Sequence, residues 1–372
     1  MSATLQDPMP TSGRLDRLRL RMGDPASAAP LDGLLVSSMT NIRYLTGFTG
    51  SAGLLLVLPT GNYLLTDGRY ESQAAEQLDA SGAPVAVAVA ARPEQRGDAQ
   101  RLVADVSRLG LEAEHISWAQ QRSYAETWFP SIDLVPAVGL VEALRAVKDP
   151  AELMRLAEAA RIADAALDQI RGALGAGPTE TEFGRRLDHQ MRELGASGPS
   201  FETIVASGPN AAKPHHRPSS RRVGRGEPVV LDFGALVDGY CSDMTRTVWV
   251  ERLEHPDIRR AYDVVLESQA AGVAAVRAGA TCADVDQACR QVIAAAGWAD
   301  RFVHGTGHGV GLDIHEAPSL SMTSTDTLVA GHVVTVEPGV YLPGLGGVRI
   351  EDTVVVTDDG CRPLTATPKD RP

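Results

Sequence analysis

The chain has 372 residues, more than one hydrophobic core usually serves, so two domains are expected. Its 44% hydrophobic and 22% charged residues are typical of a folded globular protein and exclude a disordered or fibrous class. The formal net charge of -12 argues against a nucleic-acid or anionic-membrane partner, because both need a basic surface.

Cysteine usage and apolar segments predict a cytoplasmic protein without a membrane anchor. The four cysteines, Cys241, Cys282, Cys289 and Cys361, have no metal-type spacing and are too few for a disulfide framework. The N-terminal segment has no apolar core of signal-peptide length. The longest apolar runs, such as residues 83–91, are far shorter than the roughly 20 residues of a membrane-spanning helix.

The N-terminal part of the chain alternates strand and helix patterns. Strands are predicted over residues 31–37, 54–58, 63–66 and 84–90, with the second and third joined as a hairpin. Helices are predicted over residues 69–78 and 99–108. We therefore expect an α/β domain over residues 1–143.

A helical pattern over residues 141–170 marks the domain boundary, which we place between residues 143 and 144. Pro150 favours the first turn of a new helix within this pattern. Thr179 and Glu182 have the spacing of a capping box, so another helix is predicted from Thr179 to about Leu194.

The C-terminal part has the pattern of an α+β domain over residues 144–372, with helices on a mostly antiparallel sheet. Strands are predicted over residues 228–233 and 240–250, around an Asp-Gly hairpin signal, and over 332–337 and 348–356. Helices are predicted over residues 258–278 and 282–296. A Gly- and Pro-rich loop is expected between the last two strands.

Four carboxylates lie in these strand patterns: Asp232, Asp243, Glu337 and Glu351. A buried, unpaired carboxylate loses its hydration, so a positive group should compensate each one. Strand alternation puts Arg349 on the same face as Glu351, which it could orient. Any one acid alone would more simply neutralise an arginine or face water, but four in two hairpins favour a shared site.

A glycine-rich loop between the hairpins contributes His304, His308 and His315. A lone histidine is usually structural, whereas three within twelve residues of such a loop indicate a site. Four carboxylates and one imidazole suit Mn²⁺ or Co²⁺ better than a closed structural zinc site. Because the carboxylates are too many for one ion, two ions about 3.5–4 Å apart are expected, and hydrolysis is their usual chemistry.

The chain resembles the pita-bread metallopeptidases, specifically the Xaa-Pro peptidases aminopeptidase P and prolidase, over nearly its whole length. Residues 41–50 and 66–70 are similar to the creatinase-type N-terminal domain. The catalytic-domain motifs are matched at residues 201–205, 214–215, 231–234, 242–247, 304–311, 336–339 and 349–352. The resemblance implies a creatinase-like α/β domain followed by a pita-bread domain with a curved, mostly antiparallel sheet.

The resemblance also implies residue roles. The metal ligands would be Asp232, Asp243, His308, Glu337 and Glu351, with Asp243 and Glu351 bridging two divalent ions, most simply Mn²⁺, with Co²⁺ or Zn²⁺ as alternatives. Glu337 would also shuttle a proton.

Substrate contacts follow from the same resemblance. His215 and His315 would contact substrate around the scissile bond, and His304 would line the proline pocket. We also expect Arg349 to bind substrate. The substrates would be proline-containing peptides, cleaved before the proline by a homodimer.

Several alternatives remain open from the sequence. Methionine aminopeptidase lacks an N-terminal domain of this kind, creatinase uses no metal, and a peptide-binding module without activity would lose ligands that are present here. His216 follows His215 and competes with it as the contacting group. A strict dipeptidase would need a group to pair the substrate carboxylate, for which Arg43, Arg69 or a neighbouring subunit's arginine is a hypothesis.

Overall fold

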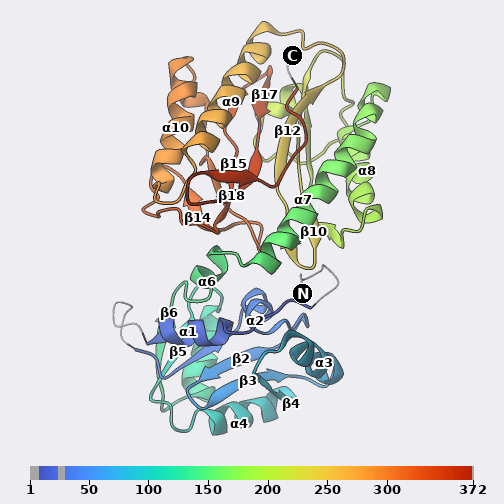
Figure 1. Ribbon diagram of the computed structural model, residues 1–372. Helices are drawn as coiled ribbons and strands as arrows, with labels where there is room; N and C mark the ends of the chain where they lie inside the picture. The colour runs from blue at the N-terminus through green and yellow to red at the C-terminus, as the bar shows by residue number, and fades with distance from the viewer. Residues whose placement is uncertain (1–7, 24–29, 371–372) are drawn as a thin grey trace. The chain divides into compact units, whose positions relative to one another are not determined.

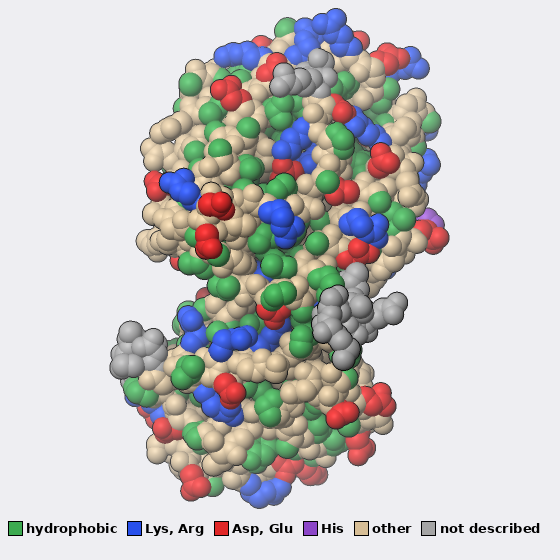
Figure 2. Space-filling model, in the orientation of Figure 1, with side chains coloured by type: hydrophobic (Ala, Val, Ile, Leu, Met, Phe, Trp, Pro, Cys, Tyr) green, Lys and Arg blue, Asp and Glu red, His purple; other side chains and the backbone are tan. Residues whose placement is uncertain are grey.

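The computed structural model describes residues 8–23 and 30–370, and the chain divides into two compact units, Met1–Arg145 and Ala146–Pro372. The division lies two residues beyond the boundary expected from the sequence. Among the helices in these described ranges, none is long and apolar enough to cross a membrane. Figure 2 shows acidic and basic side chains interspersed over both units on the face drawn.

A six-stranded mixed sheet forms the centre of the first unit, in the order β4-β3-β2-β1-β5-β6. Its strands are β1 (Gly33–Val36), β2 (Leu54–Leu58), β3 (Gly61–Thr66), β4 (Ala86–Val89), β5 (Arg108–Glu112) and β6 (Asp133–Ala137). β2 and β3 form the expected antiparallel hairpin, whereas β4 joins β3, and β5 joins β1 and β6, in parallel. Leucines of β1, β2, β3 and β5 supply much of the core.

The helices around this sheet are α1 (Arg14–Met22), α2 (Met39–Thr46), α3 (Glu71–Ser81), α4 (Arg92–Leu102) and α5 (Trp118–Ser123), which continues as a π-helical turn, Tyr124–Trp128 (Figure 1). The helix expected over residues 99–108 is wrong in position. Pro93 lies in the first turn of α4, a position that suits its fixed φ, and Arg108 already begins β5.

The second unit contains four antiparallel sheets, in the orders β11-β10-β7, β12-β9-β8, β14-β13-β15-β18-β19 and β16-β17. The strands are β7 (Gly198–Pro199), β8 (Ile204–Ser207), β9 (Pro228–Phe233), β10 (Ala235–Val237), β11 (Tyr240–Cys241), β12 (Met244–Trp249), β13 (Gly307–Gly309), β14 (Glu316–Leu320), β15 (Val333–Val336), β16 (Gly339–Leu342), β17 (Gly346–Arg349), β18 (Asp352–Val356) and β19 (Cys361–Pro363).

Helices cover these sheets from two sides: α7 and α8 on one, α9 and α10 on the other (Figure 1). They are α7 (Pro150–Ile170), α8 (Glu180–Glu193), α9 (Pro256–Ala275) and α10 (Cys282–Ala295), preceded by the short α6 (Glu142–Ala146). Short 3-10 segments are Arg171–Ala176, Gly208–Ala212 and Ala299–Arg301. One apolar core lies between α7, α8 and β8, β9 and β12, and a second between α9, α10 and β15 to β18.

Capping and turn chemistry explain where several of these elements begin. The predicted capping box at α8 is present, because the Thr179 hydroxyl accepts from the Glu182 N–H while the Glu182 carboxylate accepts from the Thr179 N–H. The Asp238-Gly239 turn joins β10 to β11 with positive φ at both residues, 44° and 74°, as a type I′ hairpin turn requires.

Two strands expected to be continuous are interrupted, and a hairpin replaces part of an expected loop. The run over residues 240–250 breaks at Ser242 and Asp243, and the run over 348–356 breaks at Ile350 and Glu351. The loop expected after Glu337 contains β16 paired with β17. Both breaks place a carboxylate where the chain passes from one sheet to the next.

Close packing explains the glycines of β13. A Cβ atom on Gly307 would lie 2.0 Å from the carbonyl oxygen of Thr335, and one on Gly309 would lie 2.3 Å from that of Ala317. No side chain fits at either position, so this strand needs glycine on both sides of His308.

Candidate metal centre

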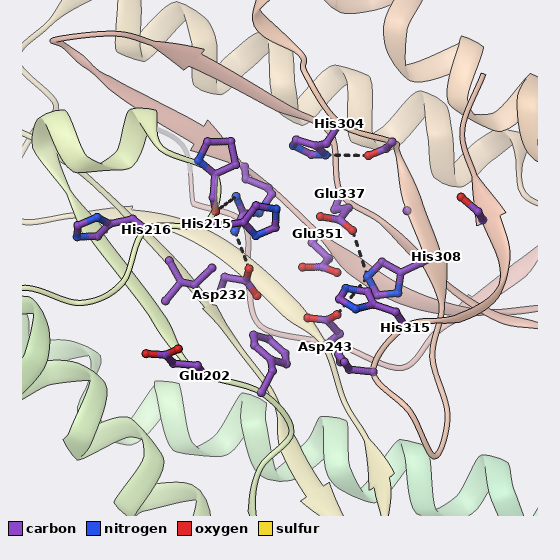
Figure 3. Close-up of a pocket in the computed structure, with 18 of the residues that line it drawn as sticks. Glu202, His215, His216, Asp232, Asp243, His304, His308, His315, Glu337 and Glu351 are labelled. Atoms are coloured by element: carbon purple, nitrogen blue, oxygen red, sulfur yellow. Dashed lines mark hydrogen bonds and ion pairs between the residues drawn. The ribbon is translucent and has the colours of Figure 1, made fainter. Parts of the chain in front are cut away.

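A pocket of about 550 Å³ lies within the second unit, and the predicted metal ligands line it (Figure 3). Asp232 comes from β9, His308 from β13, and Glu337 from the end of β15, while Asp243 and Glu351 come from the two strand breaks. Strands far apart in sequence thus bring all five side chains to one cavity.

Three of these side chains form the tightest group, here called the central cluster: Asp243, His308 and Glu351. One potential ligand atom from each lies within 4.8 Å of the other two. His308 Nε2 is 3.5 Å from Asp243 Oδ2. These distances leave room for an ion among the three side chains rather than only direct contact.

Glu337 and Asp232 flank the central cluster on different sides (Figure 3). Glu337 Oε1 lies 3.3 Å from His308 Nε2 and accepts a hydrogen bond from the Thr335 hydroxyl. Asp232 Oδ2 accepts a 2.6 Å hydrogen bond from the guanidinium of Arg349. Each flanking carboxylate is therefore fixed by a neighbouring side chain.

Arg349 differs from our expectation, because its guanidinium holds Asp232 rather than Glu351. It also donates to the hydroxyls of Tyr341 and Thr245, at 2.9 and 3.1 Å. Glu351 is oriented by Thr245 instead, through a 2.8 Å hydrogen bond to Oε2. Most N–H donors of this buried guanidinium are therefore hydrogen-bonded to other groups of the protein.

The orientation of His308 exposes one ring nitrogen to the pocket. Its Nδ1 lies 3.0 Å from the backbone carbonyl oxygen of Gly309, so Nδ1 carries a proton, and Nε2, which faces Glu337, can act as a ligand when it is deprotonated. The carbonyl fixes the tautomer in the way that partners of metal-bound histidines commonly do.

Charge crowding shifts the ionisation of the carboxylates. Burial, followed by the neighbouring carboxylates, raises the pKa of Asp243 and Glu351 well above the usual range, and burial also raises that of Asp232. Glu337 is the exception: burial opposes ionisation, but the hydrogen bond and charge of His308 lower its pKa to about 2. Without a cation among them, crowded carboxylates of this kind favour their protonated forms, whereas a bound cation favours the ionised ones.

Two carboxylate oxygens lack partners. Asp232 Oδ1 and Glu351 Oε1 are buried and make no hydrogen bond with the described residues. A buried acceptor without a donor is costly, and both atoms belong to predicted metal ligands. The donor set of oxygens and one imidazole nitrogen, with these unfilled positions, fits divalent ions.

The predicted substrate histidines occupy the same pocket. The ring of His315 packs 4.3 Å from that of His308, and burial lowers its pKa. His304 Nε2 lies 2.8 Å from the hydroxyl of Tyr341. His215 faces the metal-ligand side in Figure 3, whereas His216 points away from it. His216 Nε2 instead lies 2.8 Å from Glu180, which favours His215 as the contacting group.

Sequence reasoning missed three residues that hold the site together: Thr245, Tyr341 and Glu180. Thr245 lies two residues after Asp243, within the matched segment 242–247, but its partner Glu351 is 106 residues away. Tyr341 lies in the segment expected to be a loop. Nothing local to Glu180 indicates that its carboxylate is buried under a distant loop.

A second group of similar composition lies in the first unit: Glu112, His115 and Glu142, here called the N-terminal cluster. His115 Nε2 lies 2.7 Å from Glu142, and the Asn41 amide donates to both glutamates, at 2.7 and 2.5 Å. The backbone N–H groups of residues 37 and 38 donate to Glu112 as well. Protein donors thus surround this cluster.

Family models match both units. The model described as "Metallopeptidase family M24" matches residues 154–358. The model described as "Creatinase/Prolidase N-terminal domain" matches residues 14–147.

Individual relatives are similar along most of the chain. A Pyrococcus furiosus Xaa-Pro dipeptidase is 34% identical over 345 residues, covering 91% of this chain and 95% of the relative. The solved Xaa-Pro dipeptidase from Bacillus anthracis has a TM-score of 0.90 at 37% identity and covers 97% of this chain and 99% of its own. The X-Pro aminopeptidase from Thermotoga maritima has a TM-score of 0.84 at 33% identity, covering 91% and 97%.

Proposed function

This chain belongs to metallopeptidase family M24, and from this premise we propose that it hydrolyses the bond between an N-terminal residue and a following proline, in the manner of aminopeptidase P. It is a metal-dependent peptidase whose fold class is the expected one, a creatinase-like N-terminal domain and a pita-bread catalytic domain. The observation that carries the proposal is the pair of buried carboxylate oxygens, on Asp232 and Glu351, that make no hydrogen bond within the described part of the chain and belong to side chains lining the same 550 Å³ pocket as His308.

Asp232, Asp243, His308, Glu337 and Glu351 would hold two divalent ions, which when bound polarise the scissile carbonyl and lower the pKa of the attacking water. We propose Mn²⁺ because the donor set is rich in oxygen, and Co²⁺ and Zn²⁺ remain alternatives. We also propose a homodimer, as the resemblance implies, which sedimentation velocity tests directly, and a cytoplasmic location, as the cysteine usage indicates.

The side chains supply the proton transfers. Glu337 lines the same pocket as the metal-ligand candidates, so its carboxylate can take a proton from the attacking water and deliver it to the leaving proline nitrogen. His315 is neutral, because burial lowers its pKa, and one ring N–H can donate to the developing oxyanion. His215 can contact the same reacting region, and His304, held by Tyr341, can line the proline end.

Arg349 acts on the ligand set in this proposal. Its guanidinium orients Asp232 by donating directly to Oδ2, and its charge opposes the rise in the pKa of Asp232 that burial causes. Substrate binding by Arg349, expected from the sequence, would have to use the part of the guanidinium that Asp232, Tyr341 and Thr245 do not occupy.

A strict preference for Xaa-Pro dipeptides is the second candidate function. It is favoured by the similarity to proteins named Xaa-Pro dipeptidases. The arginines considered for pairing the substrate carboxylate lie in the first unit, where Arg69 already forms a 2.8 Å ion pair with Asp67. That pair weakens the case for Arg69.

The deciding experiment uses chelator-treated protein with and without Mn²⁺, Co²⁺ or Zn²⁺, assayed on Xaa-Pro and Xaa-Pro-Xaa peptides. We expect metal-restored cleavage before proline with both lengths. Cleavage of dipeptides alone would select the dipeptidase. Absence of cleavage with every metal would overturn the proposed function in favour of a peptide-binding module.

A further inference from the structure

A buried carboxylate outside the pocket organises the segment that carries His215. Glu180 is the first residue of α8 and has 0% of its surface exposed. It lies directly after the Thr179 cap, but its carboxylate takes no part in the capping box, which uses Glu182. A buried carboxylate of this kind is stable only when hydrogen-bond donors surround it.

The donors all come from the segment between β8 and β9. Glu180 Oε1 accepts from the backbone N–H and the hydroxyl of Ser207, at 2.8 and 2.7 Å, and from the amide of Asn210 at 3.0 Å. Ser207 ends β8, and Asn210 lies in the 3-10 segment that follows. One oxygen therefore fixes the start of the segment.

The other oxygen holds residues in the middle of the segment. Glu180 Oε2 accepts from the backbone N–H and the hydroxyl of Ser219, at 3.0 and 2.6 Å, and lies 2.8 Å from Nε2 of His216. These hydrogen bonds outweigh burial and lower the pKa of Glu180 to about 2, so the group is ionised at neutral pH. Charge-assisted bonds of this kind are stronger than neutral ones.

A second anchor holds the same segment from the pocket side. Arg349 donates to the backbone carbonyl oxygen of Pro214 at 3.2 Å, while the same guanidinium holds the metal-ligand candidate Asp232. His215 therefore stands between two tethered neighbours: Pro214, tied to the ligand set, and His216, tied to Glu180. His215 lines the pocket, and so does His216, whose Nε2 is held by Glu180.

We propose that Glu180 is a positioning residue that acts through His216 to hold His215 against the reacting centre. The inference rests on the proposed function, because it assigns His215 to the substrate. Neither Glu180 nor His216 touches substrate in this proposal. The His216 imidazole ties the backbone next to His215 to Glu180 at the start of α8, which limits how far His215 can move.

The test is a double-mutant cycle on His215 and His216 with Mn²⁺-loaded enzyme and an Xaa-Pro substrate. His215→Ala should lower kcat by about 100-fold or more, as loss of a transition-state donor does. His216→Ala should lower kcat about tenfold with little change in KM, because a misplaced group loses much of its effect. In the His215→Ala background, His216→Ala should change kcat less than about twofold.

Rescue and control variants separate positioning from general damage. His216→Gln keeps an N–H donor within reach of Glu180 and should recover most of kcat. Glu180→Gln should resemble His216→Ala, whereas Glu182→Gln removes a carboxylate from the same helical turn and should leave kinetics unchanged. All variants should retain the wild-type content of two ions per chain, measured by elemental analysis.

The outcomes distinguish the possible failures. If wild-type protein cleaves no Xaa-Pro peptide, the proposed function fails. If wild type is active and His215→Ala is impaired, yet His216→Ala has wild-type kcat, the positioning role is overturned. Equal losses from His216→Ala in both backgrounds would also overturn it, because they show an effect that does not pass through His215.

Discussion

The N-terminal cluster and the central cluster contain the same kinds of side chain at similar spacing, but their oxygens have different partners. In the N-terminal cluster, Asn41 and backbone N–H groups donate to the glutamates. In the central cluster, Glu351 keeps one buried oxygen that has no partner among residues 8–23 and 30–370, and the nearby Asp232 keeps another. Composition and distance alone therefore do not define a metal site; unfilled acceptors among crowded like charges do.

The largest expected difference between the clusters is in catalysis. Asp243→Ala removes a ligand of the central cluster and should lower kcat/KM by more than about 100-fold, beyond the 10–100-fold typical of residues that only support ligands. Glu142→Gln in the N-terminal cluster is the matched control and should leave metal content unchanged. Steady-state kinetics and elemental analysis check both, and equal metal loss in the two variants would break the comparison.

Metal should stabilise the protein through one cluster only. Mn²⁺ at 100 times its Kd should add about 2.7 kcal/mol per bound ion to the free energy of unfolding of the second unit, because the ions bind the folded state. Thermal melts with and without chelator measure the shift. Glu142→Gln should retain it, while Glu351→Gln should reduce it. A shift that survives Glu351→Gln and disappears in Glu142→Gln would place the ion in the N-terminal cluster and contradict the assignment to the central cluster.

Asn41 provides the converse test in the first unit. Its amide is fully buried and bridges Glu112 and Glu142, so Asn41→Ala should destabilise the first unit by about 1–3 kcal/mol by leaving acceptors unpaired. Denaturant unfolding monitored in the first unit measures the loss. Mn²⁺ affinity should not change, and a loss of affinity comparable to that in Asp243→Ala would contradict the separation of the two clusters.

The smallest expected effect concerns pH. Without metal, the pKa values of Asp243 and Glu351 lie well above the usual range, so these groups hold protons that an incoming ion must displace. Mn²⁺ affinity, measured by calorimetric titration, should therefore fall as pH decreases. Proton release on binding, seen as a buffer-dependent enthalpy, is the second readout. Affinity independent of pH would show that the carboxylates are already ionised.

Local patterns were enough to predict much of the fold. The β2-β3 hairpin, the α8 capping box and the type I′ turn at Asp238 each depend on signals within a few residues. The hairpin of β16 and β17 was missed because Gly and Pro around Tyr341 resemble a loop, and pairing with β17 is what makes this segment a strand.

The residue types of the site could be predicted from the sequence, but the hydrogen-bond partners that orient them could not. Asp232 and Glu351 stand out as carboxylates in apolar strands, so their chemistry is visible in the sequence. Their partners are not: Arg349 reaches Asp232 across 117 positions, and Thr245 reaches Glu351 across 106. Such pairings follow from tertiary packing, which leaves no local signal.

The two glycines of β13 are needed for the fold, whereas His308 between them is needed for the proposed reaction. Glycine is required at positions 307 and 309 because a Cβ atom at either would overlap a neighbouring backbone carbonyl, whether or not His308 binds an ion. During divergence, a descendant that abandoned catalysis would still be selected to keep both glycines, while His308 itself could drift. Glycines retained around a substituted histidine would therefore mark an inactive descendant of this fold.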